Sequence, residues 1–425
     1  MPDISEPRAI LADLFRAAVA AADPFAAIAP HLPAPPKGHT VVVGAGKGAA
    51  RMAAALESLW DGPLQGVVVT RYGHGCPTRS IRVLEAGHPE PDAAGLAASA
   101  ALFDAVSNLT EDDLVIALVS GGGSALLPAP PAGVTLEDEI AVGRALLASA
   151  APIEAMNTVR THLSRIKGGR LATATVARVH TLVVSDVPGD DPALVASGPT
   201  IPGRRTRQQA LEIVGQYGLE LPEAALRYLA SPAADAPNPD DPVFARHTHV
   251  IIASSRLSLE AAAREAGRQG IPAVILSDAI EGEARDIARM HAALALETQR
   301  RGRPFSAPVV VLSGGETTVT LRNPEGQGGR NGEFALSFAL AVAGSAGITL
   351  LAADTDGIDG TADNAGAFAD GTTVPRLLAQ GMNPAAMLAR NLSYPALAAA
   401  DTLFVTGPTG TNVNDFRAIL VEPAG

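Results

Sequence analysis

The sequence predicts an α/β protein with two domains, and three observations lead to this prediction. First, 425 residues are more than one hydrophobic core usually covers. Second, short β-branched runs alternate with alanine-rich helical stretches, which is the pattern of helices packed on a mainly parallel sheet. Third, the alternation stops at residues 231–242, a segment rich in proline and aspartate that is typical of a linker. We therefore expect domains at residues 1–240 and 241–425.

The first domain is expected to be Rossmann-like, with a mainly parallel sheet between two layers of helices. Its β-branched runs are the candidate strands, and the alanine-rich stretches between them are the candidate helices. In open sheets of this kind, ligands bind at the carboxyl ends of the strands. The strands are expected at residues 40–43, 66–71, 81–86, 114–119 and 180–185, and helices at 47–59, 92–106 and 136–150.

The second domain is expected to be a three-layer domain with a mixed sheet. A short turn at residues 313–317, Ser-Gly-Gly-Glu-Thr, joins two apolar runs, and this spacing predicts a β-hairpin. The cores of both domains must be built from aliphatic residues, because aromatic residues make up only 4% of the chain. The strands are expected at residues 249–253, 273–276, 308–312, 317–322, 348–352, 403–406 and 417–421.

Composition and charge exclude several classes of protein. The formal net charge is −12 and no basic block occurs, which disfavours nucleic acids and anionic membranes as partners. Cys76 is the only cysteine, so no disulfide can form within the chain. The N-terminal stretch has acids before its apolar part and predicts an amphipathic helix instead of a signal peptide. The uncharged segment 334–353 is broken by two glycines, so we expect no membrane span and a cytoplasmic protein.

The first glycine-rich motif, Gly-Ala-Gly-Lys-Gly-Ala at 44–49, follows an expected strand and opens an expected helix. It fits the dinucleotide-binding pattern GxGxxA, but the next strand ends at Arg71 and supplies no acid for a ribose hydroxyl. Lys47 and the N–H groups of a helix N-terminus instead suit a phosphate or carboxylate. Gly46 and Lys47 are therefore candidates for anion binding, and the alternative is that the glycines only form a tight turn.

A second motif, directly after the strand at 114–119, has three successive glycines between two serines. Glycines let the backbone direct several N–H groups to one point, and the serine hydroxyls add donors. Lys167 is a further candidate, because it lies beside two glycines and is one of only three lysines in the chain. The second motif is expected to cradle a ligand with Ser120, Gly121, Gly122, Gly123 and Ser124.

A third motif places acidic side chains after the strand at 180–185. Asp186 follows that strand, and Asp190 and Asp191 come after a proline–glycine turn. Such carboxylates suit Mg²⁺, which is usually held by one or two of them together with phosphate oxygens. A carboxylate at this place could also accept the proton of a substrate hydroxyl. The alternative is that these aspartates only form turns.

The second domain repeats the pattern of polar loops after strands. Gly315 and Glu316 follow one strand, and Arg330 lies at the mouth of a glycine loop that opens a helix. An arginine beside flexible backbone suits a phosphate or carboxylate, and a plain salt bridge is the alternative. Two more loops carry the aspartates Asp354, Asp356, Asp359 and Asp363 and the neutral residues Thr409 and Asn414.

Together these motifs resemble those of the class II glycerate kinase (glycerate 2-kinase) family, whose C-terminal module is called the MOFRL domain. They are GAGKGA, SGGGSALL, NTVRTHLSRIKGGRLA, SDVPGDDPALVASGPT, SGGETTVTL, GQGGRNGEFAL, DTDGIDGTADNAGA and TGPTGTNVND, and they span nearly the whole chain. The resemblance implies two α/β domains with the active site in the cleft between them, and a MOFRL module at about residues 305–425. It implies ATP- and Mg²⁺-dependent phosphorylation of D-glycerate to 2-phosphoglycerate. Family members have also been labelled hydroxypyruvate reductases.

The resemblance also implies roles for single residues. The key lysine and arginine correspond to Lys47 and Arg330, and Asp190 corresponds to the acid. We expect ATP and D-glycerate as the small-molecule partners, and a monomer or a homodimer. Ser255 stands where we expect an asparagine. Mg²⁺ is expected at Asp186, Asp190 and Asp356, and the substrates at Gly46, Ser120, Gly121, Gly122, Gly123, Ser124, Lys167, Gly315, Glu316, Thr409 and Asn414.

Two alternative functions remain open at this point. The first is an NAD(P)-dependent hydroxypyruvate reductase, which the literal GxGxxA pattern favours and in which Arg71 would meet a 2′-phosphate. The second is a sugar-acid or nucleotide-binding protein without catalysis. Serine-based acyl transfer and a zinc protease are disfavoured, because neither GxSxG nor HExxH occurs. His74 and His88 lie beside glycine or proline and are further candidates for ligand contact.

Overall fold

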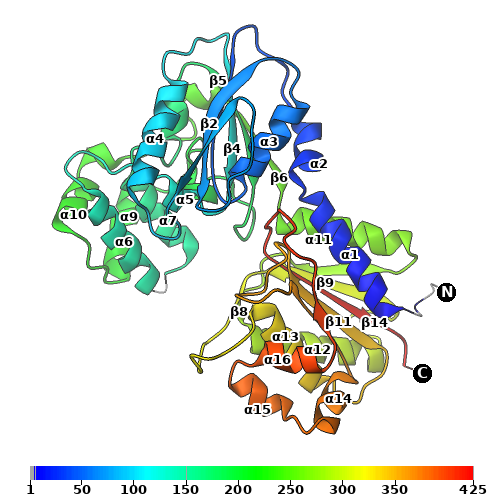
Figure 1. Ribbon diagram of the computed structural model, residues 1–425. Helices are drawn as coiled ribbons and strands as arrows, with labels where there is room; N and C mark the ends of the chain where they lie inside the picture. Colours follow the sequence, from blue (N-terminus) through cyan, green and yellow to red (C-terminus); the bar gives the residue numbers. More distant parts are fainter. Residues whose placement is uncertain (1–3, 5, 150, 425) are drawn as a thin grey trace. The chain divides into compact units, whose positions relative to one another are not determined.

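The computed structural model describes residues 4, 6–149 and 151–424. They form two compact units, and each is an α/β unit with its own six-stranded sheet (Figure 1). The N-terminal unit is Pro24–Ile252. The C-terminal unit consists of Met1–Asp23 and Ala253–Gly425. This confirms the predicted fold class.

The sheet of the N-terminal unit has the strand order β3-β2-β1-β4-β5-β6. The strands β1 to β5 pair in parallel. The central strands β1 and β4 are buried along their whole length, as expected for valine-rich strands that are covered on both faces. The strands are β1 (Thr40–Ala45), β2 (Leu64–Arg71), β3 (Ile81–Ala86), β4 (Leu114–Ser120), β5 (Arg178–Val184) and β6 (Thr248–Ala253).

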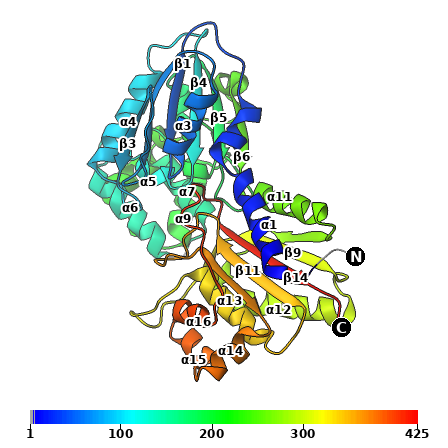
Figure 2. The same ribbon diagram turned by 45° about the vertical axis from the view of Figure 1, so that its right-hand side comes forward.

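Helices cover both faces of this sheet. The connection from β1 to β2 contains α3, and the connection from β3 to β4 contains α4. These two connections run in opposite directions along the sheet. Because such crossovers are right-handed, α3 and α4 lie on opposite faces of the sheet (Figures 1 and 2). The helices α6, α7, α9 and α10 form a separate apolar cluster beside the sheet. The helices are α2 (Pro24–Ile28), α3 (Ala49–Leu59), α4 (Ala93–Val106), α5 (Gly123–Leu126), α6 (Leu136–Ala148), α7 (Ile153–His162), α8 (Arg170–Thr173), α9 (Arg207–Gln216) and α10 (Glu223–Ala230).

The sheet of the C-terminal unit is mixed and has the order β13-β12-β11-β14-β9-β7. The strands β7 and β9 pair in parallel, and all other neighbours pair antiparallel. The strands are β7 (Ala273–Ser277), β9 (Val309–Gly315), β11 (Ile348–Asp354), β12 (Gly366–Asp370), β13 (Leu403–Phe404) and β14 (Asp415–Val421). The strands β8 (Gly282–Glu283) and β10 (Thr317–Thr318) form a separate two-stranded sheet.

Two layers of helices enclose the mixed sheet. Alternate residues of β9 point to opposite faces: Val310 packs with α1 and α11, whereas Val311 packs with α12 and α13. Figure 2 shows α1 and α11 on one side of the strands and α12 and α13 on the other. The helices are α1 (Pro7–Ala21), α11 (Ser255–Arg268), α12 (Ala284–Arg301), α13 (Arg330–Ala341), α14 (Thr373–Ala379), α15 (Pro384–Ala389) and α16 (Ser393–Ala399).

The division into units differs from the expected boundary at residue 240. The helix α1 packs in the C-terminal unit, where the ring of Phe15 lies edge-on to Phe404 and Phe416 at centroid distances of 5.1 and 5.6 Å. The proline-rich segment expected to be a linker is held within the N-terminal unit, because Arg170 donates to the carbonyls of Ala234 and Asp235. Proline-rich composition is shared by linkers and by surface loops, so it did not mark the boundary.

The expected hairpin at residues 313–317 is wrong. After β9 the chain leaves the main sheet, and the short β10 pairs in parallel with β8. The N–H and hydroxyl of Thr317 donate to a carboxylate oxygen of Asp415 at 3.2 Å each, which fixes this departure. The sequence prediction also missed β12, which pairs with β11 and β13. Among the described residues, no helix combines the length and the apolar composition needed to span a membrane.

Candidate active site

Two glycine loops interlock at the carboxyl ends of β1 and β4 in the N-terminal unit. Gly46 has φ +136°, and a Cβ there would lie 2.1 Å from Ser120 Oγ, so no larger residue fits. The N–H of Gly48 donates to Ser120 Oγ at 3.0 Å, and the N–H of Lys47 donates to the carbonyl of Gly121 at 2.9 Å. The loops meet because β1 and β4 are adjacent parallel strands, so their carboxyl ends lie at the same edge.

The second loop lies against three polar side chains, those of Lys47, His88 and Asp186. A Cβ at Gly121 would lie 1.8 Å from Asp186 Oδ2, and one at Gly122 would lie 2.9 Å from His88 Nε2 and 3.2 Å from Lys47 Cγ. Lys47 follows β1, His88 follows β3 and Asp186 follows β5, so the tertiary fold brings the three side chains together. We call the arrangement the Lys47 site; it consists of Gly46, Lys47, His88, Asp186 and the glycine loop 120–124.

The Lys47 site is electropositive. Burial and the positive charges of Lys47 and Arg71 lower the pKa of His88 to about 4, so its imidazole is neutral at pH 7. Burial and the same two cations also lower the pKa of His74. Arg71 Nε lies 2.6 Å from His74 Nε2. Lysine and arginine with neutral imidazoles make a place that favours an anion.

A hydrogen-bonded chain extends from this site to α7. Ser197 Oγ lies 2.9 Å from Ser124 Oγ and donates to Asn157 Oδ1 at 3.1 Å. Ala196 and Ser197 both have positive φ, at +54° and +59°, which costs non-glycine residues on the order of 1 kcal/mol each. The carbonyl of Ser197 also accepts the N–H of Gly168 at 2.9 Å. Ser197 therefore joins the glycine loop, α7 and the turn that contains Lys167, a role that sequence reasoning missed.

The other predicted residues of the N-terminal unit lie in different surroundings. Lys167 is 2% exposed, and its Nζ forms an ion pair with Glu139 Oε1 at 2.8 Å. Asp190 has φ +55°, and its N–H donates to the carbonyl of Val187, so it takes part in the predicted turn. Gly123 packs against Ala196, since a Cβ there would lie 2.6 Å from the Cβ of Ala196.

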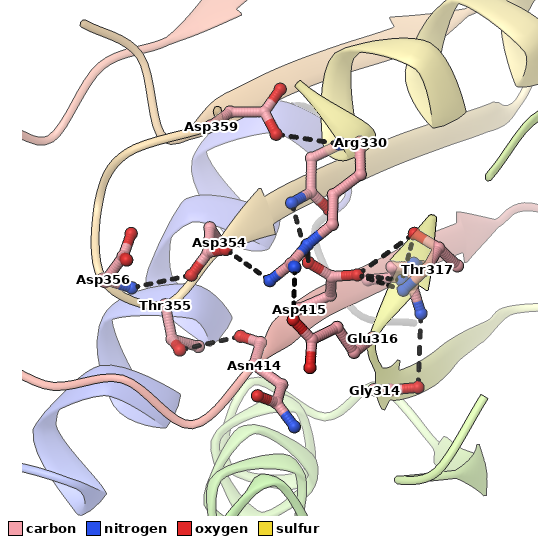
Figure 3. Close-up of polar contacts among 12 residues, drawn as sticks. Gly314, Glu316, Thr317, Arg330, Asp354, Thr355, Asp356, Asp359, Asn414 and Asp415 are labelled. Carbon is pink, nitrogen blue, oxygen red and sulfur yellow. Dashed lines mark hydrogen bonds and ion pairs between the residues drawn. The ribbon is translucent and has the colours of Figure 1, made fainter. Parts of the chain in front are cut away.

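In the C-terminal unit, one arginine pairs with three carboxylates. Arg330 donates from Nε to Asp415 Oδ1 at 2.6 Å, from Nη1 to Glu316 Oε1 at 2.7 Å, and from Nη2 to Asp354 Oδ2 at 2.7 Å (Figure 3). We call these four residues the Arg330 cluster. Glu316 is the solvent-exposed member, with 55% of its side chain accessible, whereas Asp354 and Asp415 are buried. Burial raises the pKa of Asp354, and Arg330 opposes this rise.

Asp415 is the anchor of the cluster. Its Oδ1 also accepts from Asn331 Nδ2 at 2.9 Å, and its Oδ2 pairs with Arg417. Arg417 is fully buried, with its guanidinium 5.0 Å from the ring centroid of Phe334. One carboxylate thus holds two arginines. Sequence reasoning selected the neighbouring Asn414 and missed Asp415, although both belong to the same motif.

The aspartates in the loop after β11 accept hydrogen bonds from different parts of the unit. Asp359 accepts the N–H groups of Asn331 and Gly332 at 2.9 and 2.8 Å, so it caps the first turn of α13 from another loop (Figure 3). Burial raises its pKa to about 6, and these two hydrogen bonds oppose the rise. Asp356 instead accepts the N–H of Ile358 at 2.8 Å, and its carbonyl accepts the N–H of Thr409 at 3.0 Å.

The remaining predicted residues of this unit lie close to the same loop. The carbonyl of Asn414 accepts the hydroxyl of Thr355 at 2.7 Å, and Asn414 has φ +68° (Figure 3). Gly315 has φ +114°, and a Cβ there would lie 2.3 Å from the backbone nitrogen of Ile280. Glu316 is a member of the Arg330 cluster, and the structure brings the other predicted residues to its neighbourhood: Gly315, Asp356, Thr409 and Asn414.

The positions of the carboxylate side chains show whether the protein could bind Mg²⁺. Within the described part of the chain, no three His, Cys, Asp or Glu side chains are arranged to hold a metal ion by themselves. Mg²⁺ is usually held by one or two carboxylates together with phosphate oxygens, so such a cage is not required. Asp186 has a carboxylate directly against the glycine loop, at the position that a Cβ on Gly121 would take. The donor set therefore fits Mg²⁺ that arrives with a phosphate.

Comparison with known proteins identifies the family. Residues 10–230 match the family model described as "Domain of unknown function (DUF4147)", and residues 309–415 match the "MOFRL family". The chain is 40% identical to the "Glycerate 2-kinase" of Pyrococcus horikoshii over 91% of this chain and 88% of the relative. The chain belongs to the glycerate kinase family. This confirms the resemblance inferred from the motifs.

Other members of the glycerate kinase family carry different names. The crystal structure of the Thermotoga maritima glycerate kinase matches with a TM-score of 0.88 and 37% identity, over 97% of this chain and 98% of that chain. An Agrobacterium vitis relative, 50% identical over 97% of this chain and 94% of its own length, is named "Putative hydroxypyruvate reductase". Both activities therefore need a direct comparison.

Proposed function

We propose that the protein is a glycerate 2-kinase, which transfers the γ-phosphoryl group of ATP to the 2-hydroxyl of D-glycerate and releases ADP and 2-phosphoglycerate. The observation that carries the proposal is the Lys47 site. There, two glycine loops lock together around a lysine, and a Cβ at Gly46 or Gly122 would collide with a neighbour. Close approach of backbone and an ammonium group suits phosphate oxygens.

The roles of the N-terminal residues follow from charge. Phosphoryl transfer depends mainly on positioning and on stabilising negative charge, with little covalent chemistry for the protein. Lys47 would offset charge on the transferred group, and residues 120–124 would hold phosphate oxygens. Asp186, whose carboxylate lies against the glycine loop, would hold Mg²⁺, which would supply positive charge beside the phosphate. Asp190 would orient the glycerate hydroxyl or accept its proton.

In the C-terminal unit, we propose that Arg330 binds a substrate oxyanion through Nη1. Its partner there is the exposed Glu316, whereas Nε and Nη2 face the buried Asp415 and Asp354. Exposed ion pairs contribute little free energy, so an incoming phosphate or carboxylate can replace Glu316 at low cost. Thr409, Asn414, Gly315 and Glu316 would line the substrate, and Asp356 would be a further carboxylate for Mg²⁺.

A hydroxypyruvate reductase is the competing function, because relatives carry that name. The strand β2 ends at Arg71, whose Nε faces His74. This arrangement supplies no carboxylate for the ribose of a nicotinamide cofactor at the place where the dinucleotide fold has one. The kinase therefore accounts better for the residues around the loop.

One experiment separates the two functions. The purified protein is incubated with D-glycerate, ATP and Mg²⁺, and the product is analysed by an assay that distinguishes 2- from 3-phosphoglycerate. A parallel reaction contains hydroxypyruvate with NADH or NADPH. We expect 2-phosphoglycerate and no oxidation of the nicotinamide. Oxidation that depends on hydroxypyruvate, without consumption of ATP, would replace the kinase by the reductase.

A further inference from the structure

Arg160 is a partly buried arginine without a matching anion. It lies on α7, and the one side-chain hydrogen bond that it forms within the described part of the chain runs from Nη1 to Asn157 Oδ1 at the long distance of 3.4 Å. Among the described residues it forms no ion pair within 4.0 Å. Burial lowers the pKa of Arg160, and the carboxylate of Glu139 only partly opposes this effect. Arginine does not lose its charge in proteins, so a guanidinium in this position favours an anion beside it.

Glu139 does not neutralise Arg160, because it already pairs with a second cation. Lys167 Nζ lies 2.8 Å from Glu139 Oε1, and Lys167 is buried. The other oxygen of Glu139 is buried and has no hydrogen-bond partner among the described atoms. Lys167 and Arg160 thus both depend on the carboxylate of Glu139 for opposite charge, and only Lys167 forms an ion pair with it.

The position of Arg160 is coupled to the Lys47 site. Asn157 Oδ1 accepts both from Arg160 and from Ser197 Oγ, and Ser197 Oγ lies 2.9 Å from Ser124 Oγ in the glycine loop. Asn157 is fixed from its other side, since its Nδ2 donates to the carbonyl of Leu194 at 3.1 Å. The side chain of Arg160 is therefore held near the loop that we propose to hold phosphate.

A neighbouring arginine shows what a purely structural role looks like. Arg170 donates to four backbone carbonyls, those of Thr161, Lys167, Ala234 and Asp235, at 2.9 to 3.2 Å. Its hydrogen-bonding groups join three segments of the unit. Arg160 donates to no backbone carbonyl among the described residues, so most of its guanidinium N–H groups can donate to a ligand.

We propose that Arg160 binds an oxyanion of a substrate, either the carboxylate of the hydroxy acid or a phosphate of the nucleotide. The proposal rests on the proposed glycerate 2-kinase function and extends it, because none of the sequence motifs assigned a role to this residue. The planar guanidinium can hold either group through two parallel hydrogen bonds, which lysine cannot reproduce.

The test compares Arg160→Lys and Arg160→Ala with the wild-type protein in steady-state kinetics. Arg165→Lys is the matched control, because Arg165 is exposed, lies in the same stretch and makes a single side-chain hydrogen bond to the carbonyl of Pro130. KM is measured separately for D-glycerate and for ATP, and thermal unfolding is followed for every variant. We expect KM for one substrate to rise about ten- to a hundredfold in Arg160→Ala and less in Arg160→Lys.

Each outcome has a distinct meaning. A rise in KM for D-glycerate assigns Arg160 to the carboxylate, and a rise in KM for ATP assigns it to a phosphate. If both KM values stay within about twofold of the wild type, or only the unfolding temperature falls, Arg160 is structural and the proposal is wrong.

Direct binding separates this proposal from the proposed function. Calorimetric titration of wild-type protein and Arg160→Lys with D-glycerate, and then with ATP, needs no turnover. If the wild type binds a ligand without kinase activity and Arg160→Lys binds it more weakly by more than about twofold, the kinase function fails and the role of Arg160 stands. If the two proteins bind both ligands equally, or bind neither, the role of Arg160 is excluded.

Discussion

Asp415 accepts Arg330 Nε on one carboxylate oxygen and pairs with Arg417 through the other. This pairing is set by strand register. Asp415 lies directly opposite Asp354 on β11 and opposite Gly315 on β9. The strand β14 therefore places one buried carboxylate between the ends of β11 and β9. The other partners of Arg330 are Asp354, the last residue of β11, and Glu316, which directly follows β9.

Replacing Asp415 tests this anchor. Asp415→Asn leaves the buried Arg417 without its carboxylate, and the loss of one partner of a buried pair costs about 3–5 kcal/mol. We expect the free energy of unfolding, measured by urea denaturation, to fall by about that amount. Glu316→Gln is the matched control, because it removes the exposed partner of the same Arg330 and should cost at most about 1 kcal/mol. Equal losses in the two variants would show that Asp415 is not the anchor.

Replacing Lys47 is expected to lower the rate of the reaction and to leave the stability of the fold unchanged. Lys47→Ala should lower kcat for 2-phosphoglycerate formation by about two to three orders of magnitude, since removal of one group that stabilises developing charge has effects of this size elsewhere. The unfolding temperature should stay near that of the wild type. Lys37→Ala is the control, because Lys37 is exposed. Near-normal turnover of Lys47→Ala would remove this residue from the mechanism.

The interlocking of the two glycine loops can be tested at Gly46. Gly46→Ala would bring a Cβ to 2.1 Å from Ser120 Oγ at a φ of +136°. Gly62→Ala is a close match, because Gly62 has φ +125° and no atom within 4 Å of an added Cβ. The two variants share the backbone strain of about 1–3 kcal/mol and differ in the clash. We expect Gly46→Ala to be clearly less stable in urea denaturation and to lose activity; equal stability would argue against the interlocked geometry.

The half-buried imidazole of His88 predicts a pH dependence of stability. Its folded-state pKa is about 4, below the ordinary 6.5, so the unfolded chain binds a proton more readily between these values. The contribution of His88 to stability is thus fully present above pH 6.5 and is lost as the pH falls towards 4. In His88→Asn this titrating group is absent, so the loss of unfolding free energy at low pH should be smaller than in the wild type. The difference in unfolding free energy between variant and wild type should therefore shift in favour of the variant as the pH is lowered from 8 to 5. His249→Asn, at an exposed position, is the control, and parallel curves for wild type and His88→Asn would contradict the half-buried site.

The sequence by itself determined most of the strands, the fold class and the family. Valine-rich runs predicted the central strands β1 and β4, and glycines with Lys47 after these strands predicted an anion site at their carboxyl ends. The order of the motifs along the chain indicated the family that the two family models match. These features are local, because spacing along the chain sets strand periodicity and turn geometry.

Only the tertiary structure decided which polar residues meet. Sequence reasoning selected Asn414, but the antiparallel register of β14 with β9 and β11 puts Asp415 beside Arg330. Sequence likewise does not distinguish Arg160 from Arg170, since the difference lies in which distant carbonyls each guanidinium reaches. The physical reason is that pairing between strands and burial of a charge depend on segments far apart in the chain, and local composition does not encode that pairing.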